Sequence, residues 1–322
     1  MPGVSTWVVG VLGSGLADPA APLLRVDDLG LQRGDGCFET VLVRPHVPAE
    51  PAGGDPGGGL RAVHLDAHLA RLARSAAALD LPPVDEAAWR DLVAEVLAAG
   101  RDLVADEAIL KLLLTRGESG APPGDPGTGL VTLGPVLPAI IRQRGTGLSV
   151  VGLTVGTVPG VHAVAPWLLG GVKTLSYAVN MAALREAARR GADDAVLLAA
   201  DGTVLEAPTA TVLWWAGDHL ATTPVAGTGV LPGTTQQSLF AAAAGAGLTT
   251  GYDTVSVDEL AAADAVWLAS SVRGVTPVHT LDGRPVATRP DLTALLAPVA
   301  LGDEPPAARP VPAAVPAAAP RP

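Results

Sequence analysis

Lys173 is the residue of this chain whose setting best suits nucleophilic chemistry. It lies in GGVKTLSYAVN, just after two glycines and just before a predicted helix. In an apolar and sterically open setting the charged form of a lysine is destabilised, and the neutral amine that results is a nucleophile. The same position also fits an ordinary surface lysine at the start of a helix.

Glu206 is a carboxylate inside an otherwise apolar run, VLEAPTATVLWW. An unpaired carboxylate is costly in such surroundings, so it needs a partner. A protonated ring nitrogen of a bound cofactor is one such partner. The competing interpretation is a turn residue at the end of a strand.

A phosphate could bind where LPGTTQQ, residues 231–237, makes a tight turn into a predicted helix. Backbone N–H groups and the hydroxyls of Thr234 and Thr235 suit an anion, although a simple helix cap has the same pattern. Ser271, at the end of a predicted strand, is a weaker candidate. Arg71 lies on an early helix, where most arginines are solvated and keep their stems along the helix.

Two further segments allow more than one interpretation. Lys111 interrupts the hydrophobic run ILKLLLT, which fits a pocket and the solvent face of an alternating strand equally well. Asp35 and Gly36, in RGDGCFET, fit a hairpin turn.

The composition favours a two-domain globular protein and excludes several classes. The chain has 322 residues, of which 48% are hydrophobic and only 3% aromatic, so Ala, Val and Leu must form the cores. A net charge of −11 with scattered Lys and Arg argues against nucleic acid as a partner. The lone Cys37 allows neither an internal disulfide nor a zinc cluster, and it suits the cytoplasm. We expect no signal peptide, no membrane span and no metal.

Helical and strand-like segments alternate in both halves of the chain, which predicts a mixed α/β fold. We expect a smaller N-terminal domain over 1–138, a linker over 139–146, a larger C-terminal domain over 147–300 and a disordered Pro/Ala tail over 301–322. Residues 45–59 should form a flexible hairpin insertion between two strands. The predicted helices cover 64–80, 85–100, 176–191 and 232–247, and the predicted strands include 109–117, 129–137, 147–156, 195–207, 210–225 and the first part of 264–278.

The order of these motifs is more specific than any one of them. RGDGCFET, HLARL, LKLLLTRG, KTLSYAVNMA with GADDAVLL, LEAPTATVLWW, LPGTTQQ and SSVRGVTPV occur in the order found in class IV aminotransferases, and the chain resembles this family over roughly residues 25–286. The resemblance implies a two-domain, fold-type IV structure like that of D-amino acid aminotransferase. It also implies a pyridoxal 5'-phosphate cofactor between the domains and a homodimer.

The resemblance also implies a role for each candidate residue. Lys173 would hold the cofactor as a Schiff base and act as the catalytic base, while Glu206 would pair with the pyridine nitrogen and Tyr177 would lie near the cofactor. The residues implied for the cofactor phosphate are Arg71, Thr234, Thr235 and Ser271, and those implied for a carboxylate-bearing amine substrate are Lys111, Arg116 and Phe38.

RGDGCFET and LKLLLTRG resemble aminodeoxychorismate lyases of the actinobacterial type in particular. That activity converts 4-amino-4-deoxychorismate into 4-aminobenzoate and pyruvate. The alternatives are a D-amino acid or branched-chain aminotransferase and, from another class, a carrier or regulatory protein that binds the cofactor without useful turnover. Two departures from the family stand out: Ala210-Thr211 replaces a usual Ser-Asn or Ala-Asn pair, and the loop after TRG has no arginine.

Overall fold

The computed structural model describes residues 7–46, 59–122 and 124–304. These residues form two compact units: unit 1 comprises those within 1–142 and 166–181, and unit 2 comprises those within 143–165 and 182–304. The single boundary predicted at 139–146 therefore misses the return of 166–181 to unit 1. Helix α4 (Pro138–Thr146) occupies the predicted linker. Most of the predicted insertion and tail, 47–58 and 305–322, lies outside the described residues.

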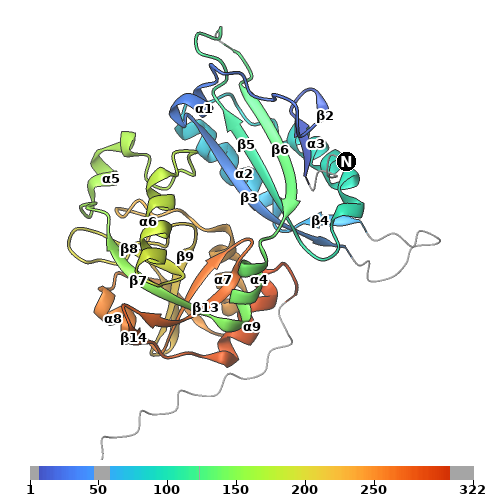
Figure 1. The fold of residues 1–322 in the computed structure, drawn as a ribbon. Coiled ribbons are helices and arrows are strands. Elements are labelled where there is room, and N and C mark those ends of the chain that lie inside the picture. Colours follow the sequence, from blue (N-terminus) through green and yellow to red (C-terminus); the bar gives the residue numbers. More distant parts are fainter. Residues whose placement is uncertain (1–6, 47–58, 123, 305–322) are drawn as a thin grey trace, which may run out of the picture. The chain divides into compact units, whose positions relative to one another are not determined.

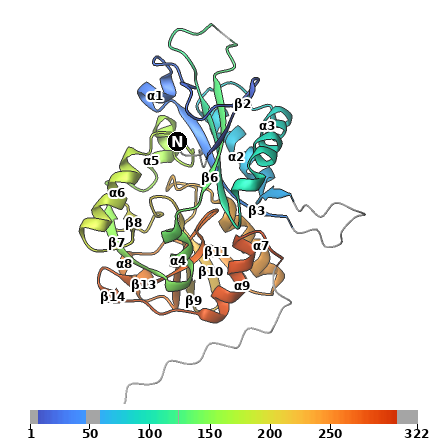
Figure 2. The ribbon, with the colours of Figure 1, turned by 45° about the vertical axis from the view of Figure 1, so that its right-hand side comes forward.

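Unit 1 is built on a six-stranded antiparallel sheet in the order β2-β1-β6-β5-β3-β4. Helices α2 (Leu65–Ala78) and α3 (Glu86–Ala99) lie against one face of this sheet (Figures 1 and 2). The remaining elements are β1 (Val8–Val11), β2 (Gly15–Ala17), α1 (Leu29–Arg33), β3 (Gly36–Pro45), β4 (Leu60–Ala62), η1 (Arg101–Leu103), β5 (Ala108–Thr115), β6 (Thr128–Pro135) and η2 (Pro166–Leu168).

Strict alternation along β3 and β5 separates the two faces of this sheet. Cys37 and Val41 of β3 pack in the same apolar core as Leu112 of β5 and the leucines of α2. Phe38 and Lys111 therefore lie on the opposite face, because successive side chains of a strand point to opposite sides. Both predicted helices are confirmed. Asp85 caps α3, accepting the N–H groups of residues 87 and 88 at 3.0 and 3.2 Å.

Unit 2 contains an eight-stranded mixed sheet in the order β11-β10-β9-β12-β13-β7-β8, with β14 beside β13. Its strands are β7 (Leu148–Thr154), β8 (Asp194–Leu198), β9 (Thr211–Ala216), β10 (His219–Thr222), β11 (Thr249–Tyr252), β12 (Ala265–Ser270), β13 (Gly274–Leu281) and β14 (Arg284–Pro285). Its other helices are α5 (Val161–Val164), α7 (Thr234–Gly245), α8 (Val257–Ala261) and α9 (Pro290–Ala300). Helices α4 and α6 (Ala178–Arg189) each contain a boundary between the units.

Two apolar cores lie on the two faces of this sheet. The adjacent residues Trp214 and Trp215 of β9 belong to different cores, as expected for consecutive strand residues. The core around Trp215 includes Leu239 of α7 and Leu296 of α9, so these helices cover that face. The sequence predicted a loop after β12, but residues 274–281 form strand β13. Gly274 makes this hairpin possible because its φ of 69° favours glycine.

Candidate active site

Lys173 is positioned by backbone pairing with the start of strand β3. Its carbonyl accepts the N–H of Phe38 at 3.1 Å, and the N–H of Leu175 donates to the carbonyl of Gly36 at 2.8 Å. Strand β4 pairs only with residues 43–45 of β3. Segment 173–175 pairs with the opposite end of β3, at Cys37. Gly36 is required here, because a Cβ would lie 2.5 Å from a β5 carbonyl and 2.7 Å from the Leu175 side chain.

The amine of Lys173 lies between two aromatic side chains. Its Nζ is 3.1 Å from Tyr177 Oη and 4.3 Å from the centroid of the Phe38 ring. The two rings contact each other edge to face, with centroids 5.0 Å apart. This arrangement holds the half-buried amine at a defined position. The structure thus brings together three of the predicted residues.

Arg71 is not solvated, as most helix arginines are, but lies in a buried ionic cluster with Glu39 and His68. Its Nε and Nη2 donate to the two carboxylate oxygens of Glu39, each at 2.7 Å, and His68 Nδ1 lies 2.7 Å from Glu39 Oε2. The exposed fractions are 0% for Glu39, 1% for His68 and 5% for Arg71. The paired geometry fixes the guanidinium plane.

This cluster shifts the pKa values of its members. Burial by itself would raise the pKa of Glu39, but the hydrogen bonds from Arg71 and His68 outweigh it and lower that pKa to about 2. Burial lowers the pKa of His68 below its ordinary value of 6.5, because desolvation outweighs the attraction of Glu39. Near neutral pH the cluster therefore contains a carboxylate, a guanidinium and a neutral imidazole.

The two cations predicted to face the substrate have different surroundings. Lys111 pairs with Thr40 across the β3–β5 ladder, on the face of the sheet that also carries Phe38. Arg116 instead bonds to Asp35 through Nε at 2.6 Å and also donates to the carbonyls of residues 79 and 80. Arg116 thus secures the RGDG turn, and its assignment to the substrate stays a prediction.

Glu206 and the turn predicted to bind a phosphate are linked within unit 2. The backbone N–H of Leu231 donates to Glu206 Oε2 at 3.1 Å, and the carbonyl of Glu206 accepts the N–H of Leu197 at 2.8 Å. Glu206 is therefore fixed on both sides, through its side chain and its backbone. Segments 206–211 and 231–235 consequently lie side by side.

Thr234 and Thr235 begin helix α7 and are 4% and 3% exposed. Neither hydroxyl is hydrogen-bonded to any residue that the structure describes. Ser271 follows strand β12, whose Ala269 pairs with Thr211 of β9, and Thr211 in turn contacts Gly233, the N-cap of α7. The three predicted phosphate ligands of unit 2 therefore lie on neighbouring segments.

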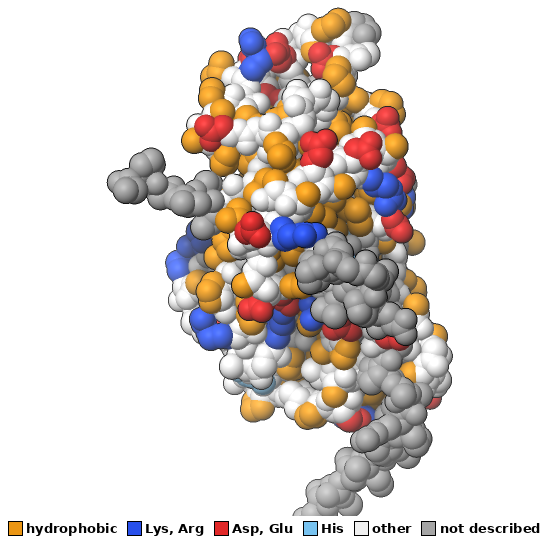
Figure 3. Space-filling model, turned by 90° about the vertical axis from the view of Figure 1, so that its right-hand side faces the viewer, with side chains coloured by type: hydrophobic (Ala, Val, Ile, Leu, Met, Phe, Trp, Pro, Cys, Tyr) orange, Lys and Arg blue, Asp and Glu red, His pale blue; other side chains and the backbone are white. Residues whose placement is uncertain are grey.

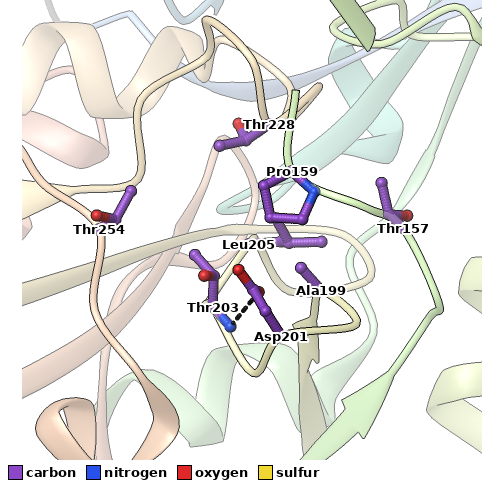
Figure 4. A pocket seen from close by; sticks show the side chains of 8 residues that line it. All are labelled: Thr157, Pro159, Ala199, Asp201, Thr203, Leu205, Thr228 and Thr254. Carbon is purple, nitrogen blue, oxygen red and sulfur yellow. Dashed lines mark hydrogen bonds between the residues drawn. The ribbon is translucent and has the colours of Figure 1, made fainter. Parts of the chain in front are cut away.

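A cavity of about 220 Å³ lies elsewhere in unit 2, and none of the predicted site residues lines it (Figure 4). The carboxylate of Asp201, on its wall, accepts the N–H of Thr203 at 3.0 Å within the hairpin turn predicted at Asp201-Gly202. Its lining residues are Thr157, Pro159, Ala199, Asp201, Thr203, Leu205, Thr228 and Thr254.

Sequence reasoning missed Glu39, His68 and Thr211. A signal for the first two was present. Glu39 lies two residues after the buried Cys37 on β3 and therefore points to the same face of the sheet, and His68 lies three residues before Arg71 on the same face of α2. Thr211 was noted only as a departure from the family pattern. Its contact with Gly233 depends on a turn geometry that spacing alone does not specify.

The surface and the helices give little support for other classes of site. In the view of Figure 3, acidic and basic side chains are scattered among apolar ones. Over residues 7–46, 59–122 and 124–304 no helix is long and apolar enough to cross a membrane. The same residues contain no group of three or more His, Cys, Asp or Glu side chains that could hold a metal ion.

Comparison with known families assigns the chain to one class. The family model described as amino-transferase class IV matches residues 36–281. The chain belongs to this family. Its members are pyridoxal-phosphate-dependent enzymes, so the predicted class, cofactor and fold are confirmed.

Individual relatives are similar over nearly their whole length. The chain is 38% identical over 289 residues to a bifunctional aminodeoxychorismate lyase / D-amino acid transaminase of Mycobacterium tuberculosis, which covers 88% of this chain and 94% of that protein. It resembles the PLP-bound form of a hypothetical aminotransferase from the same organism, with a TM-score of 0.82, 38% identity and coverage of 92% and 98%. A fold IV transaminase from Curtobacterium pusillum gives a TM-score of 0.81, 39% identity and coverage of 92% and 99%.

The residues present fit this cofactor. A phosphate needs hydrogen-bond donors, and two nearly buried hydroxyls at the start of a twelve-residue helix supply them without breaking other bonds. A protonated ring nitrogen needs a fixed carboxylate, which Glu206 provides. An aldehyde needs an accessible amine, which Lys173 provides.

Proposed function

We propose that this chain is an aminodeoxychorismate lyase, which converts 4-amino-4-deoxychorismate into 4-aminobenzoate and pyruvate. The observation that carries the proposal is the Lys173 amine, which is held 3.1 Å from Tyr177 Oη on the edge of strand β3. The relative from M. tuberculosis, named for this lyase activity, supports the choice of reaction. Membership of an enzyme family favours turnover over the carrier alternative.

Each site residue has a proposed task. Lys173 would bind the cofactor covalently through Nζ, Glu206 would hold the proton on the ring nitrogen, and the phosphate would be bound by Arg71, Thr234, Thr235 and Ser271. When bound, pyridoxal phosphate supplies an electron sink that stabilises negative charge on the amine-bearing carbon of the substrate. The neutral Lys173 amine then removes the proton from that carbon, while Tyr177 Oη keeps Nζ in place.

The fate of the substrate distinguishes the lyase from its alternative. In the lyase reaction the carbon–oxygen bond to the enolpyruvyl group breaks after Lys173 has taken the ring proton, and the ring becomes aromatic. D-amino acid transamination is the second candidate, because the M. tuberculosis relative is named for both activities. In that reaction Lys173 would return its proton at a different carbon.

The test is 4-aminobenzoate formation from enzymatically generated 4-amino-4-deoxychorismate. Wild-type protein should form the product and Lys173→Ala should not. Borohydride reduction and peptide mapping should find the cofactor on Lys173. Cofactor-loaded protein that forms no 4-aminobenzoate would overturn the lyase proposal, and D-alanine with 2-oxoglutarate would then test the transaminase.

Substitutions of Lys111 and Arg116 are a matched pair of tests for which cation binds the substrate carboxylate. We expect Lys111→Ala to raise KM with a small effect on melting temperature. Arg116→Ala should instead lower the melting temperature, because it releases Asp35 and two carbonyls. A KM unchanged in Lys111→Ala would remove that residue from the substrate site.

We also propose that the chain forms a homodimer and acts in the cytoplasm. Large apolar side chains of unit 1 are exposed, with exposed fractions of 60% for Leu31, 74% for Trp167 and 65% for Val179, and partner burial would remove such surface from water. Sedimentation equilibrium of the cofactor-loaded protein tests the dimer. A monomer at micromolar concentration would contradict it.

A further inference from the structure

Thr211 is the first residue of strand β9, and its side chain faces the start of helix α7. A tight turn over residues 207–210 connects Glu206 to Thr211. The turn is closed by the N–H of Ala207, which donates to the carbonyl of Ala210 at 2.9 Å. A Cβ at Gly233, the N-cap of α7, would lie only 2.5 Å from Thr211 Oγ1. The Thr211 hydroxyl therefore occupies the space into which a side chain at position 233 would extend.

This hydroxyl shares one property with those of Thr234 and Thr235. None of the three is hydrogen-bonded to any residue within the described part of the chain. The cap residue Gly233 also contributes no side-chain cap to α7, so the first N–H groups of the helix lack that partner. Uncommitted donors that converge on one helix start suit an anion with several oxygens, because each can donate without losing an existing bond.

We propose that Thr211 is a further phosphate-binding residue of this chain, and that Gly233 lacks a side chain so that the Thr211 hydroxyl reaches the start of α7. The inference rests on the proposed function, in which the cofactor phosphate binds at Thr234 and Thr235. It goes beyond it by assigning a further ligand on strand β9.

Titration of the cofactor-free full-length protein with pyridoxal phosphate and with pyridoxal isolates the phosphate contribution. Thr211→Val, which keeps the shape but removes the hydroxyl, should weaken pyridoxal phosphate binding by about tenfold, the usual loss for one hydrogen bond to a charged group. Binding of pyridoxal should not change. Thr211→Ser should retain the wild-type affinity for both. Thr249→Val, at the exposed start of edge strand β11, is the matched control.

The glycine is tested by a double-mutant cycle. Gly233→Ala should weaken pyridoxal phosphate binding, because its methyl group displaces the Thr211 hydroxyl. When Thr211 is already alanine, the same change should cost less, since the nearest remaining atoms, Gln236 Cβ and residue 211 Cβ, would be 3.3 and 3.6 Å away. Additive losses would contradict the proposal.

The outcomes separate this inference from the proposed function. Wild-type protein that binds no pyridoxal phosphate, and traps none on Lys173, would overturn both. Wild-type protein that binds it normally while Thr211→Val binds it equally well would overturn only the role of Thr211. An equal loss of pyridoxal and pyridoxal phosphate binding would make Thr211 a packing residue and would also overturn the inference.

Discussion

Units 1 and 2 each bury a carboxylate completely beside an arginine, yet the two carboxylates behave in opposite ways. Glu39 and Asp194 are both 0% exposed. Glu39 receives three charge-assisted contacts of 2.7 Å from Arg71 and His68, and its pKa is lowered to about 2. Burial raises the pKa of Asp194, although Arg273 partly offsets this.

The difference lies in how well the donors are aligned. Arg273 Nη2 is 2.7 Å from Asp194 Oδ2, but this oxygen has no partner of hydrogen-bond geometry among the described residues. The short distance is therefore an ion pair with poor alignment. Distance to a cation alone does not stabilise a buried carboxylate, because directed hydrogen bonds must replace its lost hydration.

The largest expected effect comes from breaking the well-aligned cluster. Glu39→Ala leaves Arg71 and His68 buried beside a cavity, and losing one partner of a buried pair costs about 3–5 kcal/mol. Urea denaturation of the cofactor-free protein measures this loss. Glu186→Ala, which removes a surface partner of Arg189 and Arg190, is the control and should change stability far less. Similar losses in the two variants would refute the contrast between buried and exposed pairs.

Acid should weaken the same cluster in two stages. His68 has a folded pKa below 6.5, so its contribution is full above pH 6.5 and falls as the pH drops below that value. Glu39 has a lowered pKa, so its contribution is lost between about 4.5 and 2. Denaturation midpoints measured from pH 8 to pH 3 should show both stages. His68→Gln should lack the first, and a midpoint that rises on acidification from pH 6.5 would contradict the assignment.

The elements that depend on local signals could be predicted from the sequence. The helix predicted over 64–80 is observed at Leu65–Ala78, and the one predicted over 85–100 begins after its Asp85 cap. The order of motifs was sufficient to identify the family. These features depend on short-range periodicity and capping, which a single sequence contains.

Features that depend on distant partners could not be predicted. Segment 166–181 belongs to unit 1 because its backbone bonds to residues 36–38, far away in the chain. Arg71 was predicted as a solvated helix residue or a phosphate ligand, and its bond to Glu39 was missed because it joins residues 32 positions apart. The first case depends on the free edge of strand β3, and the second on how helix α2 packs against that strand. No local pattern encodes either contact.

The smallest expected effect comes from Asp194→Asn. This change removes a carboxyl group whose pKa is raised in the folded protein. The remaining partner, Arg273, already has 12% of its side chain exposed to water. We expect a loss of about 1 kcal/mol or less at neutral pH, since removal of the costly charge offsets the lost attraction. Because a raised folded pKa gives stability at low pH that is lost as the pH rises, the wild-type advantage should be full at and below pH 3.8 and shrink above it. Urea denaturation at pH 4 and pH 7 tests this, and a loss at pH 7 equal to that of Glu39→Ala would show that Arg273 satisfies Asp194 as well as Arg71 satisfies Glu39.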